Sequence, residues 1–200
     1  MSSDAGSGEY GDPQTRERLL RVTQEVLVER GRGLRLAEVA ERAGVSRQAL
    51  YLHFGDRRGL ILALVRRLDE ELALADRLEH VQAAKDGAEM LTRTLRLNTE
   101  FWAQVAPIAA ILSRSKGEDE ALHAAWRDRM SYRRAAFGRI AKSLEERGEL
   151  HPEWSVEETA ELLFAITHFD SWLESSQELG WSDDHYVGTM SRLLERSLLA

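Results

Sequence analysis

The adjacent side chains Arg47 and Gln48 are the residues of this chain best suited to recognise a partner by hydrogen bonding. Arginine donates a forked pair of hydrogen bonds that matches guanine O6 and N7, and glutamine matches adenine N6 and N7. Ser46 precedes them and is a natural N-cap for a helix. The spacing therefore predicts that Arg47 and Gln48 lie in the first turn of a short helix, where a DNA-reading helix presents its base contacts.

Two short helices, at 36–42 and 47–53, must position these residues, and they meet at the sequence Ala43-Gly44-Val45-Ser46. Gly44 tolerates a left-handed backbone, which a tight connection of this kind requires. Val39, Ala40, Val45 and Leu50 are placed to pack the two helices together, and the small Ala40 and Ala43 permit a close crossing. This arrangement is typical of a helix-turn-helix, whose second helix enters the major groove of DNA.

The charge distribution supports the same interpretation, although the chain as a whole carries a net charge of −7. Residues 14–68 contain 12 arginines and 6 acidic residues, whereas residues 69–200 contain 15 basic and 25 acidic residues. A basic N-terminal third on an acidic body is the asymmetry expected when one end of a protein meets phosphates. A solvated arginine-rich surface without a partner is the alternative, and charge alone does not decide between them.

The motif resembles the DNA-binding domain of the TetR family of transcriptional regulators over roughly residues 15–65. The matching residues are Val39-Ala-x-x-Ala-Gly-Val-Ser46, followed by Leu50-Tyr51-x-His53-Phe54-x-x-Arg57-x-x-Leu60. The resemblance implies a three-helix N-terminal domain followed by a helical domain for ligand binding and dimerisation. It implies a homodimer that binds double-stranded operator DNA and responds to a small-molecule effector.

The resemblance also assigns roles to residues around the motif. Tyr51 and His53 correspond to phosphate contacts, and Arg57 stands where family members usually carry lysine. Arg35 replaces a common threonine, so the cap of the second helix is lost while a phosphate contact is still within reach. The predicted DNA-binding residues are Arg35, Ser46, Arg47, Gln48, Tyr51, His53 and Arg57.

Apolar residues at spacings of three and four predict an all-α fold of about nine helices. A disordered tail is expected over residues 1–12, the helix-turn-helix domain over 13–56, and the ligand-binding and dimerisation domain over 57–200. The expected helices are 15–30, 36–42, 47–53, 57–78, 86–105, a short one after Pro107, 118–147, 155–178 and 182–200. Ser155 and Glu158 form a capping-box pattern at the start of one of them.

The helices after residue 86 hold most of the aromatic residues, interleaved with polar residues on apolar faces. An apolar cavity with a few fixed polar groups is the general form of a small-molecule site. A packed core with satisfied polar groups is the simpler interpretation of any single residue, His168 included. The predicted ligand-binding residues are Thr94, Asn98, Phe101, Trp102, Trp126, Met130, Phe164, Thr167, His168 and Trp172.

The last two helices are the expected dimer interface, as two helices from each subunit would form a four-helix bundle. Each carries an apolar stripe, and internal packing of both stripes is the alternative. The stripes are Leu162, Ile166, Phe169 and Leu173, and then Val187, Met190, Leu193, Leu194 and Leu198.

Other function classes find little support in the sequence. Cysteine is absent, no two histidines are four residues apart, and no glycine-rich phosphate loop or G-x-S-x-G motif is present, so no enzyme activity, cofactor or metal is expected. No apolar run is long enough to span a membrane, and a cytoplasmic location is expected. We predict a repressor released from its operator by a small, largely apolar ligand. A helical interaction or ligand-binding module without DNA binding is the alternative.

Overall fold

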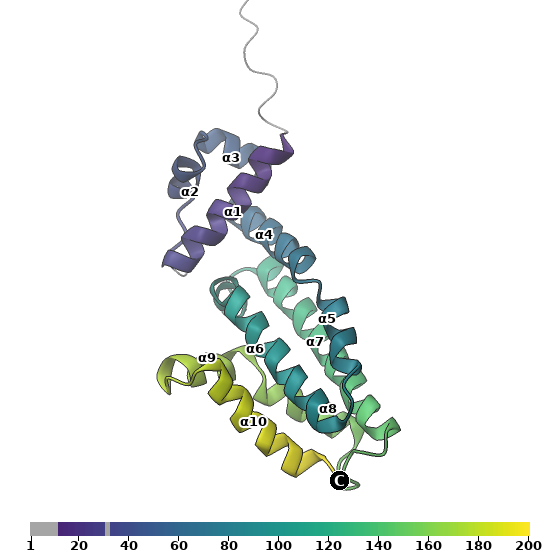
Figure 1. Cartoon of the computed structure of the whole chain (residues 1–200). Coiled ribbons are helices and arrows are strands. Elements are labelled where there is room, and N and C mark those ends of the chain that lie inside the picture. The colour runs from purple at the N-terminus through teal and green to yellow at the C-terminus, as the bar shows by residue number, and fades with distance from the viewer. Residues whose placement is uncertain (1–11, 31–32) are drawn as a thin grey trace, which may run out of the picture. The chain divides into compact units, whose positions relative to one another are not determined.

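The computed structural model describes residues 12–30 and 33–200, and its regular structure is helical apart from one isolated bridge between Leu150 and Leu199 (Figure 1). The prediction of an all-α fold is therefore confirmed. The helices are α1 (Pro13–Arg30), α2 (Leu36–Arg42), α3 (Arg47–Phe54), α4 (Arg57–Leu72), α5 (Leu74–Gln82), α6 (Gly87–Leu112), α7 (Glu120–Glu146), α8 (Val156–Ile166), α9 (Phe169–Leu173), the π-helical turn η1 (Glu174–Glu178) and α10 (Asp183–Leu198). The tail predicted over residues 1–12 lies outside the described residues except for Asp12, whose carboxylate caps α1 by accepting from the backbone N–H of Thr15 at 3.0 Å.

The backbone contacts divide the chain into two compact units. The N-terminal unit holds the described residues up to Glu71 together with residues 107–125, and the C-terminal unit holds residues 72–106 and 126–200. Helix α4 belongs to the N-terminal unit, and α6 and α7 each contribute residues to both units.

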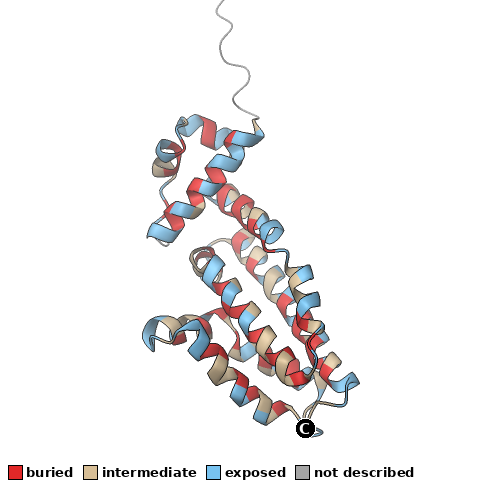
Figure 2. Cartoon of the chain, in the orientation of Figure 1, coloured by how far each residue is buried: buried red, intermediate tan, exposed pale blue. Residues whose placement is uncertain are grey.

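In the N-terminal unit, α2 packs against both α1 and α3. Leu19, Val39, Leu50 and Leu64, one from each of the first four helices, are all completely buried. The connection between α3 and α4 is tight: a Cβ at Gly59 would lie 1.9 Å from the carbonyl oxygen of Phe54, so a larger residue could not occupy that position. The helix-turn-helix of α2 and α3 is thus packed on an apolar core that all four helices share (Figure 2).

Side-chain caps begin several helices where the sequence predicts them. Ser46 accepts a hydrogen bond from the backbone N–H of Ala49 at 3.1 Å, and Asp56 accepts one from Gly59 at 2.7 Å. The capping box of Ser155 and Glu158 is complete at the start of α8. Arg35 occupies the N-cap position of α2 without a side-chain cap, as its replacement of threonine predicts.

The prediction of a single helix over residues 57–78 is wrong, because the helix is interrupted at Ala73. Ala73 adopts a left-handed conformation (φ 42°, ψ 47°) between α4 and α5. The apolar positions explain the break: the stripe that ends at Leu68 and Leu72 is out of phase with the one that continues at Leu74 and Leu78. A continuous helix could not bury both stripes, so the helix restarts.

The separate helices predicted before and after Pro107 are also wrong, because α6 continues through this proline to Leu112. Proline removes the hydrogen bond to the carbonyl four residues earlier, which is that of Ala103. Because Ala103 is exposed, water can satisfy this carbonyl and the helix is able to continue.

The helix predicted over residues 155–178 is interrupted after Ile166, which again corrects the expected bounds. The carbonyl oxygen of Thr167 accepts hydrogen bonds from Asn98 Nδ2 at 3.0 Å, Trp102 Nε1 at 2.8 Å and Arg133 Nη2 at 2.9 Å. Side chains from α6 and α7 therefore take an acceptor that a longer helix would use internally. His168 then caps the next helix, α9.

The core of the C-terminal unit is formed by the inward faces of α6, α7, α8 and α10 (Figure 2). Leu91, Leu144, Leu163 and Leu198 contribute one completely buried leucine from each of these helices. The connection between α7 and α8 meets the C-terminal residues at the bridge between Leu150 and Leu199, where His151 donates its backbone N–H to the carbonyl of Leu198 at 2.8 Å. This frame holds the polar residues described below.

Candidate functional site

One face of α3 is exposed and carries the residues that the motif predicts. Arg47, Gln48, Tyr51 and Leu52 lie at positions that share this face, and all four are exposed, Tyr51 by 49% and Leu52 by 58%. The opposite face buries Ala49 and Leu50. The helix therefore presents a guanidinium donor, a carboxamide that both donates and accepts, a phenol and an aliphatic side chain on one surface. Leu52 is an addition to the predicted set, and apolar side chains can contact the thymine methyl group in the major groove.

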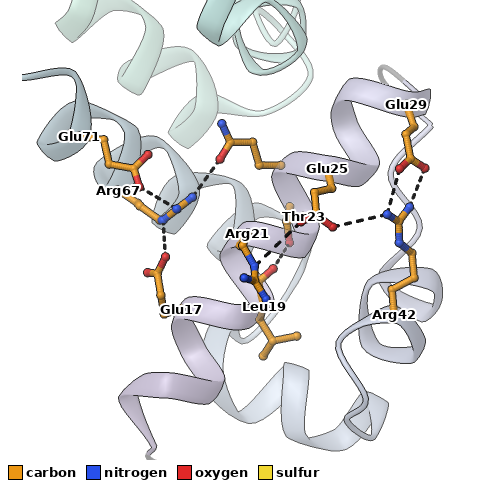
Figure 3. A network of polar contacts seen from close by, with 10 residues as sticks. Glu17, Leu19, Arg21, Thr23, Glu25, Glu29, Arg42, Arg67 and Glu71 are labelled. Atoms are coloured by element: carbon orange, nitrogen blue, oxygen red, sulfur yellow. Dashed lines mark hydrogen bonds and ion pairs between the residues drawn. The ribbon is translucent and has the colours of Figure 1, made fainter.

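Two groups of arginines in the N-terminal unit differ in their contacts, and Figure 3 shows members of the first. In the first, Arg42 holds Glu29 through a fork at 2.6 and 2.9 Å, and Arg67 bonds Glu17 at 2.7 Å and Glu71 at 2.7 Å. The Arg42 fork holds the pKa of the Glu29 carboxyl below its usual range. These arginines join helices within the unit, so they are committed to the fold.

The second group includes Arg35, Arg47 and Arg57, which are exposed. Within residues 12–30 and 33–200, no ion pair or side-chain hydrogen bond is found for any of the three. Arg57 lies in the first turn of α4, beside Asp56, whose pKa is lowered chiefly because its carboxylate accepts from the backbone N–H of Gly59. Three arginines that serve no internal contact are thus available for an external anion.

His53 is less accessible than the motif suggests. Its Nε2 atom is buried and has no hydrogen-bond partner among the described residues, and its ring lies 6.0 Å from that of Phe54. A contact with phosphate would have to use the other ring nitrogen or follow a rotation of the side chain. Ser46, also in the predicted set, is the N-cap of α3, so its oxygen already has a structural role.

A cavity of about 60 Å³ lies in the C-terminal unit, among α5, α6 and α7. Its walls are mainly apolar, and three of the predicted ligand-binding residues line it, namely Thr94, Asn98 and Phe101. The other lining residues are Leu74, Leu78, Leu97, Tyr132, Arg133, Ala136, Phe137 and Ile140. Sequence reasoning missed the two leucines of α5, because it treated that segment as the end of a connecting helix.

Arg133 is the most unusual of these lining residues, because only 8% of its surface is exposed. Nη2 bonds Asn98 Oδ1 at 2.6 Å and Thr167 Oγ1 at 3.1 Å, in addition to the carbonyl of Thr167. The guanidinium stacks over the ring of Trp102, 4.6 Å from its centroid. Burial lowers the pKa of Arg133 to about 9, so the side chain is still a cation at neutral pH.

The remaining predicted ligand-binding residues gather away from the cavity wall. Trp102 packs against Trp126 and Phe169, and Phe169 packs against Trp172, with centroids between 5.2 and 6.3 Å apart. Phe164 and His168 are in ring contact at 5.8 Å, and burial lowers the pKa of His168. Thr167 is joined to the cavity lining through Asn98 and Arg133, and Met130 through Arg133, whose Nη1 lies 3.9 Å from its sulfur. Their part in ligand binding stays a prediction.

Two further features bear on the class of protein. Across the described ranges, no cluster of three or more histidine or acidic side chains is arranged to hold a metal ion. Nor is any helix within them both long enough and apolar enough to cross a membrane.

The fold and the exposed recognition helix define a helix-turn-helix DNA-binding protein, and comparison with known proteins names its family. Residues 19–64 match the family described as bacterial regulatory proteins, tetR family. The chain is 30% identical over 173 residues to the HTH-type transcriptional repressor BepR of Brucella suis biovar 1 (strain 1330), an alignment that covers 82% of this chain and 83% of the relative. The chain therefore belongs to the TetR family of transcriptional regulators.

Solved structures share the whole fold at low sequence identity. A transcriptional regulator from Saccharomonospora viridis, in complex with choline, superposes with a TM-score of 0.82 at 16% identity and covers 94% of this chain and 100% of its own. The ketosteroid transcriptional regulator KstR2 of Mycobacterium tuberculosis superposes with a TM-score of 0.66 at 18% identity, over 96% and 98% of the two chains. These likenesses extend the fold assignment to the C-terminal helices.

Proposed function

We propose that this protein is a homodimeric repressor that reads its operator with the exposed face of α3. Arg47 and Gln48 would contact base edges, and Leu52 adds an apolar contact beside them. Tyr51, His53, Arg35 and Arg57 would contact phosphates and fix the position of the helix on the duplex. The observation that carries this proposal is the set of exposed arginines that make no internal contact, beside others committed to ion pairs in the same unit.

We further propose that a small molecule in the cavity controls operator affinity. The cavity is lined by Leu74 and Leu78 of α5, and α5 follows α4 in the chain across the left-handed residue Ala73. A ligand that fits the cavity better in one position of α5 would favour that position. Because a ligand shifts an equilibrium only through its different affinities for the two states, this contact is where its effect would begin.

Dimerisation would use the parts of α8, α9 and α10 that the subunit leaves uncovered. Within each predicted stripe some residues are core, since Phe169, Val187, Leu194 and Leu198 are buried inside the subunit. The remaining apolar residues are half-buried or exposed: Leu162, Ile166, Leu173, Met190 and Leu193. Leu193 is 52% exposed and stands at helical spacing from the half-buried Met190, so the two side chains offer an apolar face for a partner subunit.

Direct binding to DNA tests the proposal. Fluorescence anisotropy of the full-length protein with the DNA upstream of its own gene should show saturable binding that survives an excess of unrelated duplex. The change of Arg47 to alanine should weaken this binding, whereas the change of Val28, an exposed residue of α1, to alanine serves as the matched control. Equal affinity for specific and unrelated duplex would favour the alternative of a helical module without sequence-specific binding.

A further inference from the structure

The buried guanidinium of Arg133 has no counter-ion. The described residues provide no carboxylate within ion-pair distance, whereas more exposed arginines of the C-terminal unit pair with acidic side chains, as Arg93 does with Glu89 and Arg96 with Asp184. Burying a cation without an anion is costly. A protein that retains such a group normally uses it, which makes the surroundings of Arg133 informative.

The hydrogen bonds of Arg133 satisfy one edge of its fork only. Nη2 accounts for all three bonds to oxygen, namely those to Asn98 Oδ1, Thr167 O and Thr167 Oγ1. Nη1 has only the sulfur of Met130 at 3.9 Å, and no oxygen partner for Nε is found among the described residues. An arginine offers five N–H donors in a fixed plane, so several donors remain unused.

A purely structural role explains the satisfied edge and leaves the other edge unexplained. The bonds of Nη2 hold the carbonyl of Thr167 at the end of α8, where a cation also meets the negative end of the helix dipole. Stacking over Trp102, with Phe137 and Phe164 at 5.3 and 5.5 Å, offsets part of the desolvation of the cation. None of these contacts supplies an acceptor for Nε or a full negative charge.

Arg133 also lines the cavity, whose other walls cannot provide that charge. Leu74, Leu78 and Ile140 are apolar. Of the polar lining residues, Thr94 donates its hydroxyl to the carbonyl of Met90 at 2.7 Å, and Asn98 already bonds Arg133 and Thr167. The cavity thus combines apolar walls with a cation whose hydrogen-bonding capacity is only partly used.

We propose that the cavity binds a small organic carboxylate, whose anionic end meets Arg133 and whose apolar body lies against the leucine side chains of α5. A guanidinium and a carboxylate match in geometry and charge. The volume of about 60 Å³ is far below that of sites for drug-sized ligands, so only a small acid suits the cavity. This inference rests on the proposed function, in which the same cavity is the effector site.

Matched acid and amide pairs test the charge requirement on the full-length protein. Benzoate and benzamide, and hexanoate and hexanamide, differ little in shape but only the acids are anionic at neutral pH. Isothermal titration calorimetry of the wild type should give at least a tenfold lower Kd for each acid than for its amide. This comparison needs no variant, so it stands even where a substitution at position 133 impairs folding.

Substitutions then test whether the preference for acids over amides depends on Arg133. Arg133→Gln should abolish the difference between acid and amide, and Arg133→Lys should keep part of it because the charge is retained. Arg134→Gln is the matched control, since Arg134 is the next residue, is exposed, and faces the ring of Phe164 from outside the cavity lining. The control should retain the wild-type preference.

Operator binding measured in the same samples separates this inference from the proposed function. Amides that bind as tightly as acids and release DNA equally well would overturn the anion site while leaving ligand control intact. Acids that bind with the expected preference but leave operator affinity unchanged would support the anion site and contradict its role as the effector site. Failure of every acid to bind at millimolar concentration would overturn the inference.

Discussion

The arginines of the two units show opposite solutions to the same problem of placing a cation. In the N-terminal unit, Arg35, Arg47 and Arg57 stay in water on the surface, and Arg42 and Arg67 are paired with carboxylates. In the C-terminal unit, Arg133 is buried without a carboxylate, against aromatic rings and a carbonyl oxygen. A surface cation stays hydrated and carries no desolvation cost before it binds phosphate, whereas a buried cation has lost its water and must be stabilised by the surrounding protein groups.

This difference indicates where the stability of the protein resides and where its binding functions reside. The exposed face of α3 contributes little to folding, so its side chains can be chosen for the operator alone. The polar residues of the C-terminal unit serve folding and the cavity together, as Asn98 and Arg133 do at the end of α8. Mutations on the exposed face of α3 should therefore change DNA binding without changing stability. Mutations of the polar residues in the C-terminal unit should change ligand binding and stability together.

The largest effect is expected for Leu193→Asp on α10. If a partner subunit covers this leucine, the change buries an unpaired carboxylate and costs about 3–5 kcal/mol of association free energy. Sedimentation should then show monomers with weakened operator binding. Val28→Asp is the control, because Val28 is equally aliphatic and even more exposed, at 67%, on a helix outside the proposed interface. A wild-type protein that sediments as a monomer at micromolar concentration would contradict the dimer.

Truncation of an aromatic side chain should affect the two units differently. Trp102 is completely enclosed and bonds Thr167, so Trp102→Ala should lower the free energy of unfolding by about 3–5 kcal/mol. Tyr51→Ala, at a half-exposed position on α3, should change stability by less than about 0.5 kcal/mol while weakening operator binding. Urea denaturation of both variants tests the contrast, which fails if Tyr51→Ala is the more destabilising of the two.

Base and phosphate contacts within the N-terminal unit should be distinguishable by their salt dependence. Gln48→Ala should cost about 1–3 kcal/mol of binding to the operator and relax preference at one base pair. Arg57→Ala should preserve the ranking of operator variants and lower the salt slope by about one per half-site. Binding titrations at several salt concentrations measure the sequence preference and the salt slope. If Arg57→Ala changed the sequence preference and Gln48→Ala changed the salt slope, the proposed placement of α3 on the DNA would be wrong.

The break at Ala73 offers a smaller and more local test. A left-handed conformation costs an L-residue about 1–2 kcal/mol of stability. Glycine avoids this cost but lowers stability by about 0.5–1 kcal/mol, because it is more flexible in the unfolded chain. Ala73→Gly should thus stabilise the protein by about 0.5–1 kcal/mol in thermal unfolding. Ala75→Gly, two residues later in ordinary helix, should instead destabilise it by about 1 kcal/mol. Equal losses for both would mean that the break at Ala73 is absent in solution.

The smallest expected effect is the pH dependence that comes from His168. Burial lowers the pKa of His168 in the folded protein, so the unfolded chain binds a proton more readily, and stability falls as pH drops through about 6.5. His168→Gln should flatten the difference in unfolding free energy between pH 7.5 and 5.5, and a variant that keeps the full wild-type difference would contradict this origin.

The helix-turn-helix could be predicted because its signals are local. The turn at Gly44, the cap at Ser46 and the apolar positions of α2 and α3 lie within one short segment, and each depends on its neighbours in sequence. The boundaries of α5, α6 and α8 could not be predicted in the same way. At Thr167 the helix ends because side chains from α6 and α7 bond its carbonyl, and no local pattern reports such partners.

The sequence by itself determined the all-α fold, the family and the recognition helix, because periodicity, caps and turns act between neighbouring residues. It also held a signal for Arg133, which stands at helical spacing between the apolar residues Met130 and Phe137 and so occupies the buried stripe of α7. Only the tertiary structure decided that Leu74 and Leu78 line the same cavity as Arg133, and that the aromatic residues pack on one another. The physical reason is that burial and the pairing of a charge depend on groups brought together from distant parts of the chain.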